Sequence, residues 1–392
     1  MRDVVIAGVG MTPFGKFPDR SHASLVAEAT RQALGDAGAP TGDVQFVYYS
    51  NTAAGLMTGQ ESVRGQHAVR GTGLEGVPLI NVENACASGS TALNQAWLAV
   101  ASGQVDVAIA IGAEKLTSSD KSKALAVMTS ALDQDCLQEV RDDLGDAGTG
   151  SVFMDIYARF ATWYANRTDA TPEDFAQIAV KNHAHGALNS KAQYGGQMTV
   201  EQVLSARPIS GPLTLPMCAP MSDGAAATVV TTPQVAARWG AESVRLLATV
   251  IGAGTPGVYG ELVPGTAHRA YEMAGLAPGD LDVVECHDAA SPAELIVCEE
   301  LDLCPPGEAT KLLRTGATTL GGDLPINPSG GLESKGHPIG ATGLAQVVEL
   351  SDQLRGRCGS RQVPDARIAL AENAGGYIGP DAAAASVTIL GV

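Results

Sequence analysis

Two segments far apart in this chain follow the same pattern. The sequence CASGSTAL begins at Cys86 and HPIGATGL begins at His337, and both read x-x-x-Gly-x-Thr-x-Leu, with their first residues 251 positions apart. Each segment follows an extended stretch and opens an Ala-rich helical pattern. In a duplicated fold, such segments face each other across a pseudo-two-fold axis. The repeat therefore predicts that the Cys86 thiol and the His337 imidazole meet at two helix N-termini, as an activated nucleophile.

A second pair of segments supports the duplication. AGAPTGDVQFVYYSN, which contains Gly38, aligns with AGLAPGDLDVVECHD, which contains Gly275, at an offset of 237 residues. Short apolar runs alternate with helical stretches throughout, which predicts an α/β fold whose strands are buried on both faces. We expect two homologous halves, built from residues 1–116 plus 195–235 and from residues 240–392. The N-terminal half then spans 1–235 and includes an insertion at about 117–198.

The expected insertion carries an unusual concentration of aromatic residues. Five of them fall between Phe153 and Tyr164, although aromatic residues make up only 4% of the chain. This stretch has the spacing of a helix and no counterpart in the second half. Two interpretations stay open: the helix covers a pocket, or it packs the insertion onto a core of its own.

Composition excludes several classes of function. The net charge of −17 and the lack of a basic run argue against nucleic-acid binding, and a phosphate-bearing ligand would need a local basic patch. No run approaches 18 apolar residues, and the N-terminus reads as a strand rather than a signal peptide, so we expect no membrane association. The 7 cysteines form no Cys-x-x-Cys spacing, which predicts free thiols in the cytoplasm and no metal site.

Cys86 and His337 are the first candidates for chemistry. A thiol at the bend before a helix gains from the helix dipole and from free N–H groups, which favour the thiolate. The same dipole disfavours imidazolium, so His337 is expected to be a competent base. The alternatives are a small buried cysteine and a structural histidine that caps a turn.

Two further loops are candidates for the site. His287 and Asp288 follow a buried strand at the end where α/β proteins place site residues, although a loop hydrogen bond is an equally good explanation. Asn373 and Gly375 lie in the sequence NAGGYIG after another strand. Its Gly-Gly pair predicts N–H groups aimed at an oxyanion, and the alternative is a plain glycine turn.

Together these motifs resemble the thiolase superfamily over essentially the whole chain. The Cys86 segment is similar to the thiolase nucleophile motif, and residues 327–343 resemble the Gly-His-Pro block, which is the most specific match. The sequence HDAAS from His287 is similar to the His-Asp-Cys-Phe motif of sterol-carrier-protein type thiolases. The sequence DGAAAT from Asp223 also fits, and this branch resembles the bacterial and archaeal enzymes of that type.

The resemblance implies a five-layered αβαβα fold with two stacked mixed sheets, and a homodimer or homotetramer. It implies acyl transfer through a thioester on Cys86, with His337 as the activating base. His287 would help to bind the thioester oxygen in one oxyanion hole, and the N–H groups of Cys86 and Gly375 would form the other. Coenzyme A, as substrate or product rather than a cofactor, would enter under residues 117–200. A small partner with a zinc ribbon and an OB-fold is also implied.

The chain departs from the family at the second catalytic cysteine. That residue acts as acid and base at the α-carbon, and this chain has Asn373 at one of its two usual positions and Ala289 at the other. The expected substitutes are His287, water, Tyr377 or a residue of a partner. The primary hypothesis is a thiolase that forms or cleaves a β-ketoacyl-CoA. The alternatives are a C-acyltransferase or decarboxylating, ketosynthase-like condensing enzyme, and a non-catalytic CoA-binding subunit.

Overall fold

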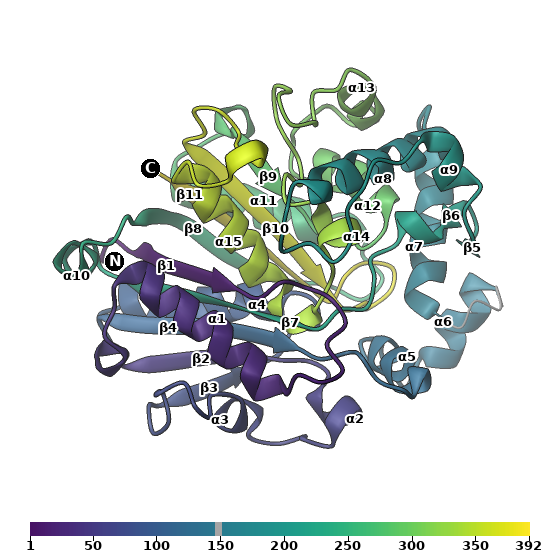
Figure 1. Cartoon of the computed structure of the whole chain (residues 1–392). Helices are drawn as coiled ribbons and strands as arrows, with labels where there is room; N and C mark the ends of the chain where they lie inside the picture. Colours follow the sequence, from purple (N-terminus) through teal and green to yellow (C-terminus); the bar gives the residue numbers. More distant parts are fainter. Residues whose placement is uncertain (146–150) are drawn as a thin grey trace.

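The computed structural model describes residues 1–145 and 151–392 and is built on one large mixed sheet (Figure 1). The strand order is β3-β2-β4-β7-β1-β8-β11-β10-β9, and β5 and β6 form a separate two-stranded sheet. The strands are β1 (Val5–Met11), β2 (Phe46–Ser50), β3 (Leu79–Val82), β4 (Val107–Glu114), β5 (Pro208–Ser210), β6 (Leu213–Thr214), β7 (Gly224–Thr231), β8 (Val244–Ala253), β9 (Val283–Glu285), β10 (Ile368–Gly375) and β11 (Ala384–Gly391).

The large sheet consists of two halves with the same internal arrangement. In the first half β2 and β4 are parallel, and β4, β7 and β1 follow antiparallel to one another. The second half repeats this order with β9, β10, β11 and β8. The halves hydrogen bond through β1 and β8 at two register pairs, Val5 with Arg245 and Ile6 with Val244. The two expected sheets are therefore joined at one edge into a continuous sheet.

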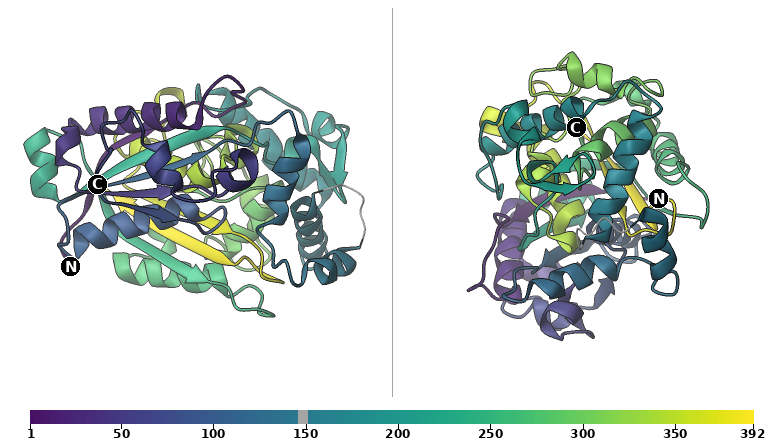
Figure 2. Two further views of the ribbon diagram at one scale, coloured as in Figure 1. Left: turned by 90° about the horizontal axis from the view of Figure 1, so that it is seen from below. Right: turned by 90° about the vertical axis from the view of Figure 1, so that its right-hand side faces the viewer.

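Helices form the remaining three layers, and the predicted αβαβα order is confirmed (Figures 1 and 2). Helix α1 packs on the outer face of the first half, and α11 packs on the outer face of the second. Helices α4 and α15 pack against each other between the halves. The α-helices are α1 (His22–Ala37), α2 (Ala54–Thr58), α3 (Arg64–Ala68), α4 (Ser88–Ala101), α5 (Lys121–Thr129), α6 (Leu137–Leu144), α7 (Val152–Ala165), α8 (Pro172–Ala187), α9 (Val200–Leu204), α10 (Pro233–Trp239), α11 (Leu262–Ala274), α12 (Ser291–Glu300), α13 (Ala309–Arg314), α14 (Gly331–Lys335) and α15 (Thr342–Leu354).

The sequence explains why these layers pack so closely. Strands β1, β4, β7 and β11 are buried along their whole length, as their continuous apolar runs predict. On β1, a Cβ atom at Gly8 would lie 2.3 Å from the backbone oxygen of Ala33 on α1, so only glycine permits this approach. Helix α1 begins at Ser21, whose hydroxyl accepts from the Ser24 N–H, and ends at Gly38 with a φ of 62°.

Residues 117–145 and 151–198 gather at one end of the sheet and contain α5, α6, α7 and α8 (Figure 1). Both interpretations of the aromatic stretch apply to helix α7. Tyr157 and Phe160 line a cavity, whereas Val152 and Ile156 form a small core cluster with Leu132 of the same insertion. Ala161 and Tyr164 join the main core of the protein. The division of the chain at residues 235–240 stays a prediction. In the described part of the chain, no helix is long and apolar enough to cross a bilayer.

Candidate active site

Cys86 and His337 lie together, as the repeat predicts. Cys86 precedes α4, His337 precedes the short 3₁₀ helix that leads into α15, and Cys86 Sγ lies 3.3 Å from His337 Nε2. The glycines of the two segments make this approach possible. A Cβ atom at Gly89 would lie 3.0 Å from the Leu344 nitrogen, and one at Gly343 would lie 2.6 Å from the Ser90 nitrogen. The shared motif therefore brings the two helix N-termini into contact.

The hydrogen bonds of His337 determine which of its ring nitrogens carries the proton. Its Nδ1 lies 2.7 Å from Thr342 Oγ1. That hydroxyl donates its single proton to the Pro338 carbonyl oxygen at 3.1 Å, so it accepts from His337 Nδ1–H. The lone pair of Nε2 is then free and points at the Cys86 thiol. The ring is thus held in the tautomer that can remove the thiol proton.

The backbone around Cys86 is shaped to present the sulfur. Ala85 adopts a positive φ of 46°, which is uncommon for a residue with a side chain and gives the sharp bend before the nucleophile. A Cβ atom at Gly375 would lie 2.9 Å from the Cys86 nitrogen and 2.4 Å from the Asn84 oxygen, so only glycine fits. The N–H of the next residue, Gly376, favours the thiolate form of Cys86. The Gly-Gly pair therefore does lie against the nucleophile.

Burial dominates the electrostatics of this pair. It raises the pKa of Cys86 to about 12, against the smaller opposing effect of the Gly376 N–H. The N–H groups at this bend favour the thiolate, as expected, but the loss of solvation is the larger effect on the resting thiol. Burial, followed by the charge of His287, also holds the pKa of His337 well below 6.5. The pair rests as a neutral thiol and a neutral imidazole.

His287 completes a compact cluster. Its ring lies edge-on to that of His337 at a centroid distance of 5.3 Å, and the ligand atoms of Cys86, His287 and His337 all lie within 4.8 Å of one another. Burial lowers the pKa of His287 to about 4. Its Nε2 is buried and has no hydrogen-bond partner among the described residues. This nitrogen is free to bind a group of the substrate.

Glu372 lies behind His287 and was not indicated by the sequence. One carboxylate oxygen accepts from the His287 backbone N–H at 2.9 Å, and the other has no partner in the described part of the chain. Burial raises the pKa of this carboxyl to about 7, against the lowering effect of that N–H. Glu372 lines the same cavity as Cys86. Its position on β10, one residue before the expected Asn373, is the only sequence signal that could have indicated it.

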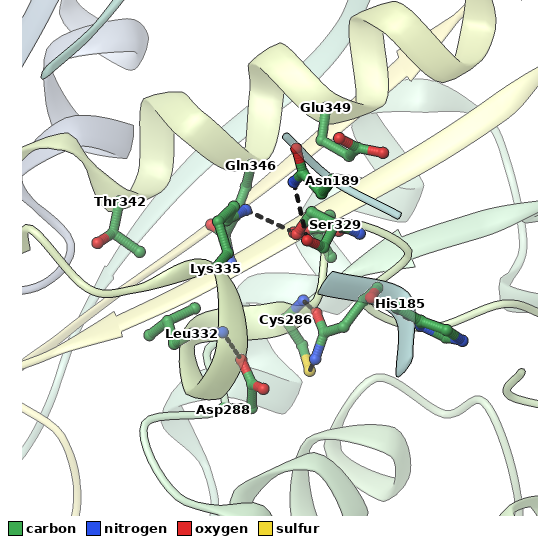
Figure 3. A network of polar contacts seen from close by, with 12 residues as sticks. His185, Asn189, Cys286, Asp288, Ser329, Leu332, Lys335, Thr342, Gln346 and Glu349 are labelled. Carbon is green, nitrogen blue, oxygen red and sulfur yellow. Dashed lines mark hydrogen bonds and ion pairs between the residues drawn. The ribbon is translucent and has the colours of Figure 1, made fainter. Parts of the chain in front are cut away.

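Asp288 supports the site from the rear and does not line the cavity with its neighbour His287. It is fully buried and accepts a hydrogen bond from the Leu332 backbone N–H at 2.7 Å (Figure 3). It also accepts from Asn182 Nδ2 at 2.9 Å. A Cβ atom at Gly331 would lie 2.1 Å from its carboxylate, so α14 rests directly on Asp288. The loop-hydrogen-bond interpretation therefore holds for Asp288.

The structure does not bring every expected residue to the cavity. Asn373 is fully buried on β10, neither polar atom of its side chain has a partner among the described residues, and it is not part of the cavity wall. Its side chain alternates with that of Glu372, which does line the cavity. Ala289 lines the cavity, as does Cys218, a second cysteine that the sequence had not placed. Cys218 Sγ donates to the Thr214 oxygen at 3.5 Å, outside the Cys86 cluster.

The cluster opens into a cavity of about 610 Å³, a size typical of sites for drug-sized ligands. Three basic side chains on its wall, those of Lys16, Lys121 and Arg207, are exposed, and none forms an ion pair with a described residue. Apolar and aromatic side chains form much of the rest of the wall. These include Leu125, Met128, Phe153, Met154, Tyr157, Phe160, Val263, Ile296 and Val297.

The Cys-His-His cluster has the ligand types of a zinc site. One thiol and two imidazoles within 4.8 Å of one another could hold a divalent ion by their sulfur and nitrogen atoms. A metal bound there would occupy the thiol and the base together. The expectation that the protein has no metal centre stays a prediction.

The chain is similar to known families and relatives over most of its length. Residues 4–198 match the family described as "Thiolase, N-terminal domain", and residues 260–391 match "Thiolase C-terminal domain-like". The acetyl-CoA acetyltransferase of Methanothermobacter thermautotrophicus is 38% identical over 387 residues, covering 96% of this chain and 97% of that protein. The benzoylsuccinyl-CoA thiolase subunit of Thauera aromatica is 37% identical over 387 residues, covering 96% and 95%.

Solved structures also match this chain over its whole length. An aldolase complex, Ltp2–ChsH2(DUF35), matches with a TM-score of 0.80 and 26% identity over 100% of this chain and 98% of that chain. Human mitochondrial 3-ketoacyl-CoA thiolase matches with a TM-score of 0.73 over 100% and 98%, and at 19% identity it shows the shared fold alone.

Proposed function

The chain belongs to the thiolase family and is a thiolase-type acyltransferase, and from that premise we propose that it forms or cleaves a β-ketoacyl-CoA through an acyl thioester on Cys86. One observation carries the proposal. The free Nε2 of His337 lies 3.3 Å from the Cys86 sulfur, and Thr342 fixes the ring in the tautomer that can take the thiol proton. A neutral thiol with a base at this distance is a nucleophile ready for activation.

In the cleavage direction, the Cys86 proton passes to His337 Nε2 as the sulfur attacks the ketone carbon of the substrate. The carbon–carbon bond next to that carbon then breaks, which leaves an acyl-Cys86 thioester and a carbanion on the departing acyl-CoA. His287 Nε2, buried and unpartnered among the described residues, binds the thioester oxygen of that acyl-CoA. The backbone N–H groups of Cys86 and Gly375 stabilise the oxyanion at the attacked carbon. Coenzyme A then takes the acyl group from Cys86 and returns the sulfur to its resting state.

The carbanion must receive one proton, and the cavity wall offers several donors for it. His287 and Tyr377 were expected from the sequence, and Glu372 and Cys218 are added by the structure. Glu372 is the best matched of these, because burial raises its pKa to about 7 and a general acid works best when its pKa is near the working pH. It has one carboxylate oxygen without a partner in the described part of the chain.

Coenzyme A is assigned to the basic side of the cavity. Lys16, Lys121 and Arg207 place three cations, none of them paired with a described residue, on the wall of a protein whose net charge is −17. Phosphate groups would meet the local positive charge that an acidic protein must supply for such a ligand. The thioester end would then reach Cys86 under α5 and α7, and the reaction needs no cofactor in addition to coenzyme A as substrate or product.

The absence of cysteine at Ala289 favours one second candidate, C-acyl transfer or decarboxylative condensation. Loss of carbon dioxide generates the carbanion directly, so no α-carbon base is required. The same Cys86 thioester would form first. A purely CoA-binding, non-catalytic role is opposed by the intact Cys86–His337 geometry.

We also propose a homodimer or homotetramer and a small partner protein, in the cytoplasm. Strand β3 is an edge strand of the sheet, its residue Ile80 is 47% exposed, and Leu98 on α4 is 38% exposed. Such an edge is a surface that a second copy could cover. One solved relative is an aldolase complex with a second component, ChsH2(DUF35), which supports the proposal of a small partner protein. A zinc ribbon and an OB-fold in that partner follow from the family resemblance. All 7 cysteines are free thiols, which suits a reducing compartment.

Intact-protein mass spectrometry tests the assignment. Incubation with acetyl-CoA or a bulkier acyl-CoA should add one acyl group, and Cys86→Ala should abolish the adduct. Release of carbon dioxide from a malonyl thioester would favour the condensing alternative. Cleavage of a β-hydroxyacyl-CoA to an aldehyde, without any adduct, would favour aldolase chemistry and contradict the acyl-cysteine mechanism.

A further inference from the structure

Outside the Cys86–His287–His337 cluster, the cavity has a second pair of polar side chains. Glu300 is the last residue of α12, Tyr259 lies just before α11, and both line the cavity and are half-buried. Across residues 1–145 and 151–392, neither the Glu300 carboxyl nor the Tyr259 hydroxyl makes a hydrogen bond or an ion pair. Two unpaired polar groups from separate elements thus border the same cavity.

Apolar and aromatic side chains hold this pair in place. Helix α12 packs against both α7 and α11 (Figure 1). The Tyr259 ring lies edge-on to Trp163 at a centroid distance of 5.0 Å and tilted against Phe160 at 6.0 Å. These contacts fix the ring, and therefore the position of its hydroxyl. Val263 and Ile296 are among the neighbouring cavity residues. Glu300 and Tyr259 consequently supply two polar groups in a part of the cavity wall that otherwise suits an apolar acyl chain.

Charge decides which ligand group this pair accepts. Burial raises the pKa of Glu300 well above its ordinary range, and the nearby carboxyls of Asp381 and Glu372 add to the effect. Burial also raises the pKa of Tyr259, followed by the effect of Glu300. Both shifts favour the protonated forms, in which each group can donate as well as accept a hydrogen bond. Burial of a carboxylate beside the Asp381 and Glu372 carboxyls would cost much more solvation free energy than burial of a neutral hydroxyl, and a hydroxyl could also accept from one member of the pair and donate to the other.

We propose that Glu300 and Tyr259 bind a hydroxyl group carried by an otherwise apolar acyl chain, so that the preferred substrates are hydroxylated, bulky acyl-CoA thioesters. The proposal rests on the proposed function in one respect, namely that the acyl group of the CoA thioester occupies this cavity. Glu300 is then a specificity-determining residue outside the Cys86 cluster. A site built to hydrogen bond a substrate hydroxyl discriminates strongly against the analogue that lacks it.

Binding measured without catalysis separates this proposal from the reaction itself. The full-length Cys86→Ala protein would be titrated by calorimetry with phenylalkanoyl-CoAs of graded chain length, and with the matching para-hydroxyphenyl and para-carboxyphenyl compounds. At the chain length that reaches the pair, we expect the hydroxyl compound to bind about 10- to 100-fold more tightly than the plain phenyl compound. The carboxyl compound should bind more weakly than both.

Substitution of Glu300 then assigns the preference. In the Cys86→Ala background, Glu300→Leu should remove the preference for the hydroxyl and retain binding of the plain phenyl compound. Glu300→Gln keeps a hydrogen-bonding group of the same shape, so part of the preference should remain even if the leucine variant folds poorly. Glu299→Gln is the matched control, because Glu299 on the same helix bonds Tyr164 and does not line the cavity, and it should leave the preference unchanged.

Each outcome bears on the proposal. Equal binding of the phenyl and hydroxyphenyl compounds at every chain length would overturn it, as would a preference that survives in Glu300→Leu. Neither result would affect the acyl-cysteine mechanism, which the mass adduct tests separately. Failure of every acyl-CoA to bind would overturn both.

Discussion

Removal of the Thr342 hydroxyl should slow the acylation of Cys86, although Thr342 does not contact the thiol. Thr342 is fully buried at the start of α15 and contacts His337, not the thiol. Thr342→Val keeps the shape and β-branching of the side chain and removes only the oxygen that accepts from His337 Nδ1–H. The variant should fold, with a loss of about 1 kcal/mol from the hydrogen bond to the Pro338 oxygen.

The size of the effect follows from the charge that develops on His337. Once the ring has taken the thiol proton it is an imidazolium, and its Nδ1–H bond to Thr342 becomes a hydrogen bond from a charged donor. Such bonds contribute about 1.5–3 kcal/mol, and an unpaired buried N–H also favours the wrong tautomer. Because each ~1.4 kcal/mol changes a rate tenfold, acylation should slow by about 10- to 100-fold.

Single-turnover acylation of Cys86 measures this directly. Enzyme in excess would be mixed with acyl-CoA, quenched at intervals and analysed by intact mass, so that coenzyme A release and later steps do not contribute. Thr342→Ser restores the hydroxyl and should recover most of the rate. An acylation rate in Thr342→Val equal to that of the wild type would refute the assignment of the His337 tautomer. An equal loss of rate in Thr342→Ser and Thr342→Val would refute it as well.

Four further outcomes follow from the site. Because the pKa of His337 is held well below 6.5, the neutral base persists as the pH falls, so the acylation rate should stay level through pH 6.5 and decline only at lower pH; a midpoint at 6.5 would contradict this. Gly375→Ala should lower the free energy of unfolding by about 1–3 kcal/mol in denaturant titrations and slow acylation, because its Cβ would lie 2.4 Å from a carbonyl oxygen; unchanged values would count against the packing. Glu372→Gln should retain acylation and slow deuterium exchange at the α-carbon of acetyl-CoA by about 10²–10⁴-fold. Loss of this exchange in Tyr377→Phe alone would instead assign the α-carbon acid–base role to Tyr377. Zn²⁺ should inhibit acylation and a chelator should restore it, since the ion would engage the Cys86 cluster; inhibition of the wild-type protein without uptake of zinc, or zinc uptake that is undiminished in Cys86→Ala, would contradict this.

The layered fold and the central pair could be predicted because they rest on local patterns that repeat. The helix-entry motif at Cys86 and at His337 includes the glycines that let two helix ends touch, so a duplicated chain must bring them together. The continuous apolar strands likewise require helices on both faces. The junction of β1 with β8 was not predictable, because two register pairs between edge strands leave no periodic trace in the sequence.

The parts of the site that depend on tertiary surroundings were beyond the sequence. The sequence predicts the helix terminus beside Cys86, but it does not show the burial that removes solvent from the thiol and raises its pKa. Asp288 follows a strand as site residues do, yet it turns inward to hold α14. Glu300 and Tyr259 lie on different elements and become a pair only when α11 and α12 pack together.

The most direct test of the account combines the adduct with turnover. Purified protein and Cys86→Ala would each be given coenzyme A and acetoacetyl-CoA, then bulkier β-ketoacyl-CoAs, while thioester products and protein mass are followed together. The account predicts one acyl group on the wild-type protein, thiolysis of a bulky substrate, and neither in Cys86→Ala. Thiolysis at an undiminished rate in Cys86→Ala, or turnover with no acyl group on the wild-type protein, would contradict it.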